Sequence, residues 1–223
     1  MSTAMIVGAS RGIGAEFVRQ YVADGWTVHA THRDAVPPTG DRDVTWHRLE
    51  VTDQASLERL VQGLGDTAID VLILCAGILL GREMTADQVD RAAWAETFAV
   101  NAIAPLAIAG ALRPHLRRGT QRKLVAVSSR LGSMGENLRG GLYMYRSSKA
   151  ALNAVWRSLA IDWQPDGLLC TVLHPGWVRT DMGGPNGDID ARESVTGMRK
   201  VIAGLTPAQS GAFFNYDGTP IAW

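Results

Sequence analysis

Tyr145 and Lys149 form a pair whose types and spacing could carry out acid–base chemistry. They stand four residues apart in YRSSK, at the start of a helix-like stretch, so one helical turn would place both side chains on the same face. A free phenol has a pKa of about 10, and a neighbouring positive charge lowers that pKa. The pair is therefore either an activated tyrosine acid or two side chains that merely touch on a surface helix. Tyr143 is a weaker candidate because Ser147, not a lysine, follows it by four residues.

A glycine-rich stretch, GASRGIG at residues 8–14, follows an apolar run and opens a helical pattern. The glycines Gly8, Gly12 and Gly14 allow a tight turn. They would also let a pyrophosphate approach the helix N-terminus, where free N–H groups and the helix dipole favour anions. This placement predicts a dinucleotide-binding loop. Three further candidate cofactor contacts lie in it: Ser10, Arg11 and Ile13.

The choice of dinucleotide depends on the end of the second expected strand. An NAD site usually has an acidic residue there, but this strand ends Thr31-His32-Arg33. Arg33, together with Arg11, suits the 2′-phosphate of NADP(H). The sequence therefore favours NADP(H), and NAD(H) less, although Arg33 followed by Asp34 could also be an exposed loop residue.

Strand and helix patterns alternate along the chain and would position these residues. We expect strands at 4–8, 26–31, 44–51, 69–75, 123–129, 168–174 and 211–216. We expect helices at 12–24, 54–64 (capped by Asp53), 87–112 (kinked at Pro105), 144–164 and 191–204, and a loop at 35–43. Several strands are apolar on both faces, so we predict an α/β fold: a single domain over residues 1–223 with a doubly wound parallel sheet covered by helices on both faces.

Composition excludes several classes of protein and of site. The 223 residues are 46% hydrophobic with a net charge of zero, which does not indicate a nucleic-acid partner. The two cysteines, Cys75 and Cys170, lie in apolar runs without metal-ligand spacing, so we expect free thiols, no metal site and a reducing compartment. The longest apolar run, 71–80, is too short to span a bilayer, and the N-terminus lacks a signal pattern. We therefore expect a cytoplasmic protein without a membrane partner.

The sequence resembles the short-chain dehydrogenases/reductases over nearly its whole length. Short motifs occur in the order of that family: GASRGIG, C-A-G at 75–77, V-N at 100–101, S-S at 128–129, Y-x-x-x-K at 145–149 and P-G-x-x-x-T at 175–180. The stretches YRSSKAALN and HPGWVRTDMGG resemble the subgroup of C-factor-like proteins and sniffer-type carbonyl reductases. Three residues depart from the family pattern: Val7, Cys75 and Glu50.

The resemblance implies a role for each candidate residue. Tyr145 would be the general acid or base, and Lys149, helped by the oxidised nicotinamide, would stabilise the phenolate and hold the ribose. Ser129 would bind the substrate oxygen, although Ser128 or Ser133 could take that place, and Asn101 would hold a relay water. The implied cofactor contacts also include Ala76, Gly77, Glu50, Val51, Pro175, Gly176, Val178 and Thr180.

These observations predict an NADPH-preferring oxidoreductase that interconverts a small-molecule carbonyl and its alcohol. A dinucleotide-binding signalling or regulatory protein is the alternative. Four residues are either an apolar substrate wall or plain core: Leu131, Tyr143, Trp177 and Met182. Helices 87–112 and 144–164 are apolar on more than one face, which favours a homodimer or homotetramer. The apolar residues of the second helix are Leu152, Val155, Trp156, Leu159, Ile161 and Trp163.

Overall fold

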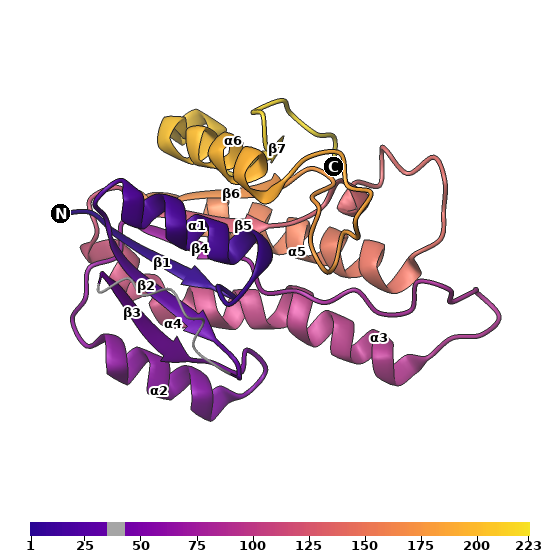
Figure 1. Ribbon diagram of the computed structural model, residues 1–223, viewed down its shortest axis with the longest axis horizontal. Coiled ribbons are helices and arrows are strands. Elements are labelled where there is room, and N and C mark those ends of the chain that lie inside the picture. Colours follow the sequence, from indigo (N-terminus) through magenta and orange to yellow (C-terminus); the bar gives the residue numbers. More distant parts are fainter. Residues whose placement is uncertain (35–42) are drawn as a thin grey trace.

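Within the described residues, 1–34 and 43–223 of a computed structural model, seven parallel strands form one sheet (Figure 1). Their order is β3-β2-β1-β4-β5-β6-β7. The strands are β1 (Thr3–Val7), β2 (Thr27–His32), β3 (Val44–Arg48), β4 (Val71–Leu74), β5 (Lys123–Val127), β6 (Leu169–His174) and β7 (Phe213–Asn215). The strand order reverses between β1 and β4, where open sheets of this kind bind ligands. The predicted α/β fold is confirmed, and the loop expected at 35–43 lies outside the described residues except for residue 43.

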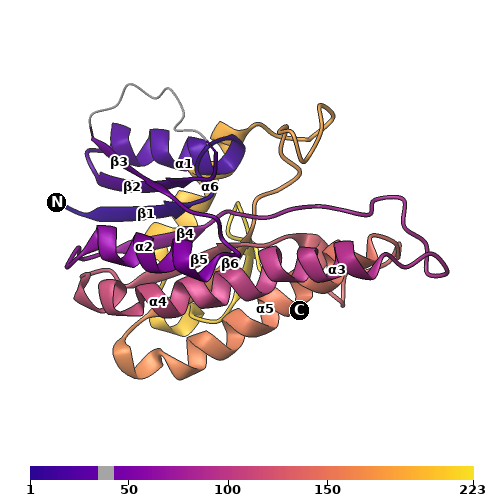
Figure 2. The same ribbon diagram turned by 90° about the horizontal axis from the view of Figure 1, so that it is seen from below.

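Six α-helices among the described residues connect the strands and cover both faces of the sheet. They are α1 (Gly12–Ala23), α2 (Gln54–Leu64), α3 (Arg91–Phe98), α4 (Ala104–Arg118), α5 (Tyr143–Asp162) and α6 (Ala191–Gly204). Figure 2 shows α1 and α6 on one face, with α2, α4 and α5 on the other. As predicted, Asp53 caps α2, since its carboxylate accepts a hydrogen bond from the Ala55 N–H at 3.0 Å.

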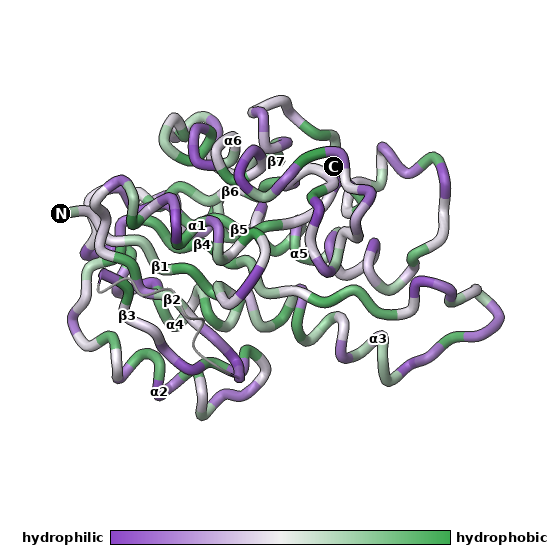
Figure 3. The backbone as a smooth tube through the Cα atoms, in the orientation of Figure 1, coloured by the Kyte–Doolittle hydropathy of each residue, from purple (hydrophilic) through white to green (hydrophobic). Residues whose placement is uncertain are grey.

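The central strands are apolar on both faces because each face has a core of its own. In β1, Met5 and Val7 pack with residues of α2, α4 and α5, whereas Ala4 and Ile6 pack with residues of α1 and α6. This alternation follows from the two-residue period of a strand. Figure 3 shows the mostly hydrophobic course of the middle strands. Both faces of the sheet are therefore covered by helices. The carboxyl edge of the sheet and the loops that follow the strands remain available to form a site.

The helical stretch around Pro105 differs from the prediction. It begins at Arg91, and the helix continues through Pro114 to Arg118, so both predicted ends, 87 and 112, are wrong. A π-helical turn, Ala99–Ile103, replaces the expected kink: the Ala104 N–H bonds to the Ala99 carbonyl five residues back. Pro105 has no N–H to give to the Asn101 carbonyl four residues back, so an α-helical bond cannot form there. Such π turns are frequent at functional sites.

Among the described residues, one helical stretch, Arg91–Arg118, is long and apolar enough by length and composition to cross a membrane. In its most apolar window 44% is buried inside the protein. Ile108, Leu112 and Leu116 on this stretch are fully buried in the core beneath α2 and α5. A core helix that covers a sheet shows the same pattern, so the stretch is weak evidence for a membrane span.

We expected a second, uncovered apolar face on the helix at 144–164, and that expectation is largely wrong. Most of the residues behind that expectation lie in the chain's own core: Leu152, Trp156, Leu159 and Trp163. Val155 is partly buried and Ile161 is exposed. Helical periodicity counts apolar positions but does not say whether the core of the same chain or a second chain covers them.

Candidate active site

The loops that follow β1, β4, β5 and β6 meet at the carboxyl edge of the sheet (Figure 1). Parallel strands bring these loops together whatever their separation in sequence. They carry the glycine loop, the stretch Cys75–Ile78, the serines at 128–129 and the stretch 175–180. The site residues predicted from the sequence therefore converge on one edge of the sheet. The candidates that follow β2 and β3, Arg33, Glu50 and Val51, lie at the same edge.

Ser129, Tyr145 and Lys149 come together at this edge. Tyr145 and Lys149 lie on the buried side of α5, and the Lys149 ammonium nitrogen lies 5.8 Å from the centre of the Tyr145 ring. Lys149 donates a hydrogen bond to the Val127 carbonyl at the end of β5, at 2.9 Å. Ser129 follows two residues later, and its hydroxyl is near enough to the Tyr145 phenol to lower the pKa of that group. The pair is therefore not an incidental surface contact, because both side chains are buried against the strand end.

Burial raises the pKa of Tyr145 to about 12, because a buried phenolate loses its hydration. The Ser129 hydrogen bond and the positive charge of Arg82 act in the opposite direction, with smaller effect. Burial also lowers the pKa of Lys149 to about 8. At neutral pH the phenol is therefore protonated, and the ammonium lies close to its titration. The expectation that Lys149 lowers the pKa of Tyr145 is not met in this structure, where burial outweighs the lowering causes and Lys149 is not among them. The further effect of an oxidised nicotinamide stays a prediction.

Of the three candidate serines, the geometry favours Ser129. The Ser128 hydroxyl donates to the Asn153 side-chain oxygen at 2.6 Å, and both groups are buried. Ser133 accepts from the Glu136 N–H at 3.1 Å, on the far side of the turn Arg130–Gly132. The Ser129 hydroxyl also accepts a hydrogen bond, from the Leu131 N–H at 3.1 Å, but of the three serines it is the one that lowers the pKa of Tyr145.

Asn101 lies in the π turn, fully buried, beside Lys149 and Gly77. Its side chain accepts from the Ile78 N–H and donates to the Ile78 carbonyl, both at 2.9 Å, and donates to Ser148 at 3.0 Å. The amide therefore fixes the segment that follows β4, where Cys75 departs from the family pattern. The relay water that the resemblance implied stays a prediction, and the side-chain amide groups already have protein partners.

The glycine loop fits a dinucleotide. A Cβ on Gly8 would lie 2.7 Å from the Ala76 nitrogen, and a Cβ on Gly14 would lie 2.1 Å from the Gly8 carbonyl oxygen, so neither position accepts a side chain. Gly8 and Gly12 also have positive φ values, 80° and 56°. Ser10 and Arg11 are exposed and Ile13 is half-buried. No side chain caps α1, so its first N–H groups are available to a phosphate.

The stretch 175–180 lies against the glycine loop. A Cβ on Gly12 would touch the Thr180 methyl group at 3.4 Å. Val178 pairs with Ile189, and Thr180 pairs with Gly184, which ties residues 178–189 into a folded flap. Pro175 is anchored because its carbonyl accepts from the Ser194 hydroxyl at 2.5 Å. Gly176 has a φ of 83° and packs against Ile189, where a side chain would clash.

The groups expected at the adenine end occupy the ends of β2 and β3. Arg33 is exposed and pairs with its neighbour Asp34 at 3.1 Å, whose carboxylate raises the Arg33 pKa. Arg11 pairs with Asp181 of the flap at 2.8 Å. Glu50 accepts from the Thr52 hydroxyl at 3.1 Å, and Val51 packs partly into the core. Both arginines are exposed, and each has a carboxylate partner in the structure.

Sequence reasoning missed Arg82, in the loop between β4 and α3. Its positive charge acts on Tyr145, and its guanidinium donates to the Met182 carbonyl of the flap at 2.5 Å. The residue stands in no motif and no periodic pattern, so the sequence contained no signal for it. It lies between α5 and the flap, because Gly81 packs against Met144 and Arg82 bonds to Met182.

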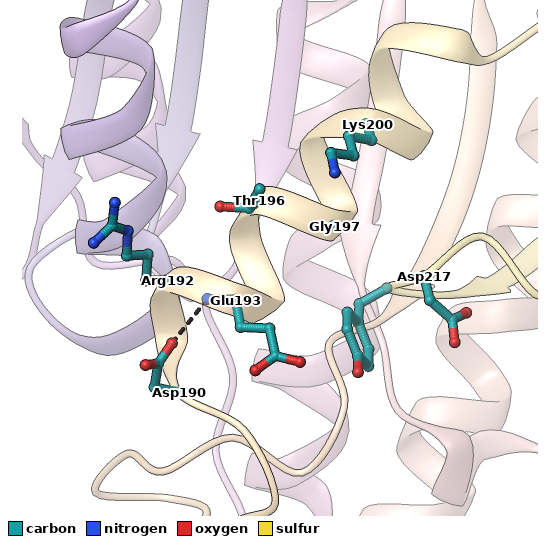
Figure 4. A pocket seen from close by; sticks show the side chains of 8 residues that line it. Asp190, Arg192, Glu193, Thr196, Gly197, Lys200 and Asp217 are labelled. Atoms are coloured by element: carbon teal, nitrogen blue, oxygen red, sulfur yellow. Dashed lines mark hydrogen bonds between the residues drawn. The ribbon is translucent and has the colours of Figure 1, made fainter.

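A cavity of about 530 Å³ lies away from these residues, between α6 and Asp217 after β7 (Figure 4). Asp190, Glu193 and Asp217 contribute carboxylates to its wall, and Asp190 caps α6 through the Glu193 N–H at 2.8 Å. None of the predicted site residues lines this cavity. The candidate active site is thus defined by converging side chains and loops, not by this cavity.

The sheet order and the glycine loop define the class of dinucleotide-binding α/β proteins. Within that class, the chain belongs to the short-chain dehydrogenase family, because the family model described as "short chain dehydrogenase" matches residues 2–189. The C-signal protein of Myxococcus xanthus is 48% identical over 155 residues, which are 70% of this chain and 93% of that protein.

Two solved carbonyl reductases have the same fold over the whole chain. The carbonyl reductase Sniffer of D. melanogaster has a TM-score of 0.94 at 30% identity, with all of both chains covered. The NADPH-bound carbonyl reductase from chicken fatty liver has a TM-score of 0.92 at 33% identity, covering 100% of this chain and 94% of that one. The resemblance to sniffer-type and C-factor-like proteins is therefore confirmed, and the chain is an oxidoreductase of this family.

Proposed function

We propose that this protein is an NADPH-preferring carbonyl reductase. The observation that carries the proposal is the convergence of Ser129, Tyr145 and Lys149 beside a glycine loop built for a dinucleotide. The phenol of Tyr145 is protonated at neutral pH, so it holds the proton that reduction of a carbonyl needs, while Ser129 and Arg82 oppose the rise in its pKa that burial causes and that would weaken it as an acid. The NADPH-bound carbonyl reductase from chicken liver supports the choice of cofactor.

The cofactor would lie along the carboxyl edge of the sheet. The N-terminus of α1 and the glycine loop would hold the pyrophosphate, and Arg33 with Arg11 would meet the 2′-phosphate. Ala76, Gly77 and the stretch Pro175–Thr180 would enclose the nicotinamide end. NADPH supplies the hydride when it is bound. The chain's own side chains would bind the carbonyl compound and transfer the proton.

The side chains bind the carbonyl and move one proton. The Ser129 and Tyr145 hydroxyls donate hydrogen bonds to the carbonyl oxygen and stabilise the negative charge that develops on it. Tyr145 then gives its proton to that oxygen, and the product leaves as an alcohol. Lys149, with a pKa of about 8, can supply the positive charge that stabilises the resulting phenolate and can pass a proton toward it.

The test is NADPH oxidation with a panel of aldehydes and ketones. The proposal expects turnover of some of them with formation of the alcohol. The alternative, a dinucleotide-binding signalling protein, is favoured by the 48% identity to the C-signal protein. It predicts that NADPH binds but that no carbonyl of the panel is reduced.

Arg33→Asp should lower the preference for NADPH over NADH. The substitution replaces a phosphate partner with a repulsive carboxylate, so we expect the ratio of kcat/KM for the two cofactors to fall by about 10-fold to 100-fold. Steady-state rates with each cofactor measure the ratio, and Arg33→Lys serves as the charge-conserving control. An unchanged ratio would show that Arg33 is a surface residue and leave the discrimination to Arg11.

We also propose that the chain forms a homodimer or homotetramer through α4 and α5. These helices lie side by side in both ribbon views and expose Ile103, just before α4, with Leu106 and Ile161. Such exposed apolar side chains favour a partner surface. Sedimentation at micromolar concentration should give at least twice the 24.0 kDa of one chain. A single species at the monomer mass would refute the assembly but not the activity.

A cytoplasmic location remains part of the proposal. Cys75 and Cys170 are free thiols in the structure, which suits a reducing compartment. Burial raises the pKa of both thiols to about 12, so neither is activated for reaction.

A further inference from the structure

Arg82 spans the gap between the helix that carries Tyr145 and the flap. A Cβ on Gly81 would lie 2.9 Å from the Met144 sulfur, so the loop before Arg82 rests on the first turn of α5, next to Tyr145. On the other side, Nη2 of Arg82 donates to the Met182 carbonyl at 2.5 Å. The guanidinium is near enough to Tyr145 that its positive charge acts to lower the pKa of that phenol.

In the described part of the chain, no carboxylate forms an ion pair with Arg82. Asp181, which stands next to Met182 and would be the obvious partner, pairs instead with Arg11 at 2.8 Å. The Met182 carbonyl takes one donor of a guanidinium that has five N–H groups. The others can hold a planar anion in a bidentate hydrogen-bond pair.

Exposed apolar side chains stand on the two elements that Arg82 joins. Tyr143 begins α5, Met182 lies in the flap, and Trp177, just before the flap, donates to the Gly183 carbonyl at 2.8 Å. They are 42%, 38% and 51% exposed, unlike the core residues of the same elements. Large exposed apolar groups on the elements beside a guanidinium suit a ligand with an apolar body and one negative end.

We propose that Arg82 determines substrate specificity by binding a carboxylate, so that the preferred substrates are aldehydes or ketones with an apolar body and a carboxylate group. This inference rests on the proposed carbonyl reductase activity. Arg82 holds the carboxylate, while Ser129 and Tyr145 hold the carbonyl oxygen, and the distance between the two anchors selects the length of the substrate.

The test compares acids with their methyl esters at several spacings. The probes are 2-, 3- and 4-formylbenzoate and a longer aliphatic ω-oxo acid, each measured against its own methyl ester with NADPH. In the wild type, the acid should be favoured by tenfold or more in kcat/KM at one spacing at least. Arg82→Gln should bring that ratio close to one, while loss of the positive charge that acts on Tyr145 should also lower acid and ester rates by the same factor, and Arg82→Glu should reverse the preference.

Two controls separate specificity from other effects. Arg59→Gln removes an exposed positive charge on α2 and should leave the acid-to-ester ratio unchanged. A merely structural role of the Arg82–Met182 hydrogen bond would slow acids and esters alike. An acid-to-ester ratio that is the same in wild type and Arg82→Gln at every spacing would overturn the inference. Failure to reduce any acid or ester would instead contradict the proposed activity itself.

Discussion

Tyr145→Phe should lower kcat with every carbonyl substrate by about 10²-fold to 10⁴-fold, which is the usual contribution of a general acid. The substitution removes one hydroxyl and keeps the ring, which is buried against Lys149. Folding and NADPH binding should therefore persist. Steady-state reduction rates, thermal unfolding and a fluorescence titration with NADPH measure the three properties separately.

Tyr21→Phe provides a matched control for this variant. Tyr21 is also a buried tyrosine whose pKa burial raises to about 12, but it lies in α1, where it contacts Arg199. Its variant should show a change in stability without the loss of kcat. Wild-type reduction rates in Tyr145→Phe would show that another group is the acid.

Ser129→Ala should lower kcat/KM by about 10²-fold to 10³-fold, because it removes one of the two hydroxyls that stabilise the carbonyl oxygen. It also removes the hydrogen bond that lowers the pKa of Tyr145. The pKa of that phenol should therefore rise further, which makes the tyrosine a weaker acid. The measurement is the reduction rate with one good substrate over a range of pH.

Ser133→Ala and Ser128→Ala are the controls, since both residues were candidates by sequence. Ser133→Ala should keep nearly full activity. Ser128→Ala leaves the buried Asn153 side chain without its 2.6 Å partner, so it should cost about 1–3 kcal/mol of stability. If Ser128→Ala abolished turnover in a folded protein while Ser129→Ala stayed active, the assignment of Ser129 would be wrong.

The parts of the site that the sequence predicted are those that backbone geometry and spacing determine. Gly8 and Gly14 were predictable because a close approach of backbone to backbone requires glycine, and Tyr145 with Lys149 because four residues make one helical turn. The order of strands and helices followed from apolar runs that both faces of the sheet bury. These signals are local, and the structure confirms the placement that they imply.

The parts that the sequence did not predict depend on contacts between distant segments. Arg82 is placed in the site by its hydrogen bond to Met182, which lies one hundred residues later in the sequence. Three serines looked alike in the sequence, and only the structure shows that Ser129 is the one near Tyr145. The π turn at 99–103 took the place of an expected kink, and the burial of Trp156 and Trp163 removed most of an expected partner surface. The pKa of Tyr145 depends on burial, which spacing alone does not reveal.

Transfer of deuterium from labelled NADPH tests the central claim most directly. NADPH deuterated at both C4 positions is incubated with the enzyme and a carbonyl compound from the panel, and the alcohol is analysed by mass spectrometry. We expect one deuterium on the carbinol carbon of the product, one alcohol for each NADPH oxidised, and almost no product with Tyr145→Phe. Tight binding of NADPH without any label in an alcohol, for every aldehyde and ketone of the panel, would contradict the claim and favour a dinucleotide-binding signalling protein.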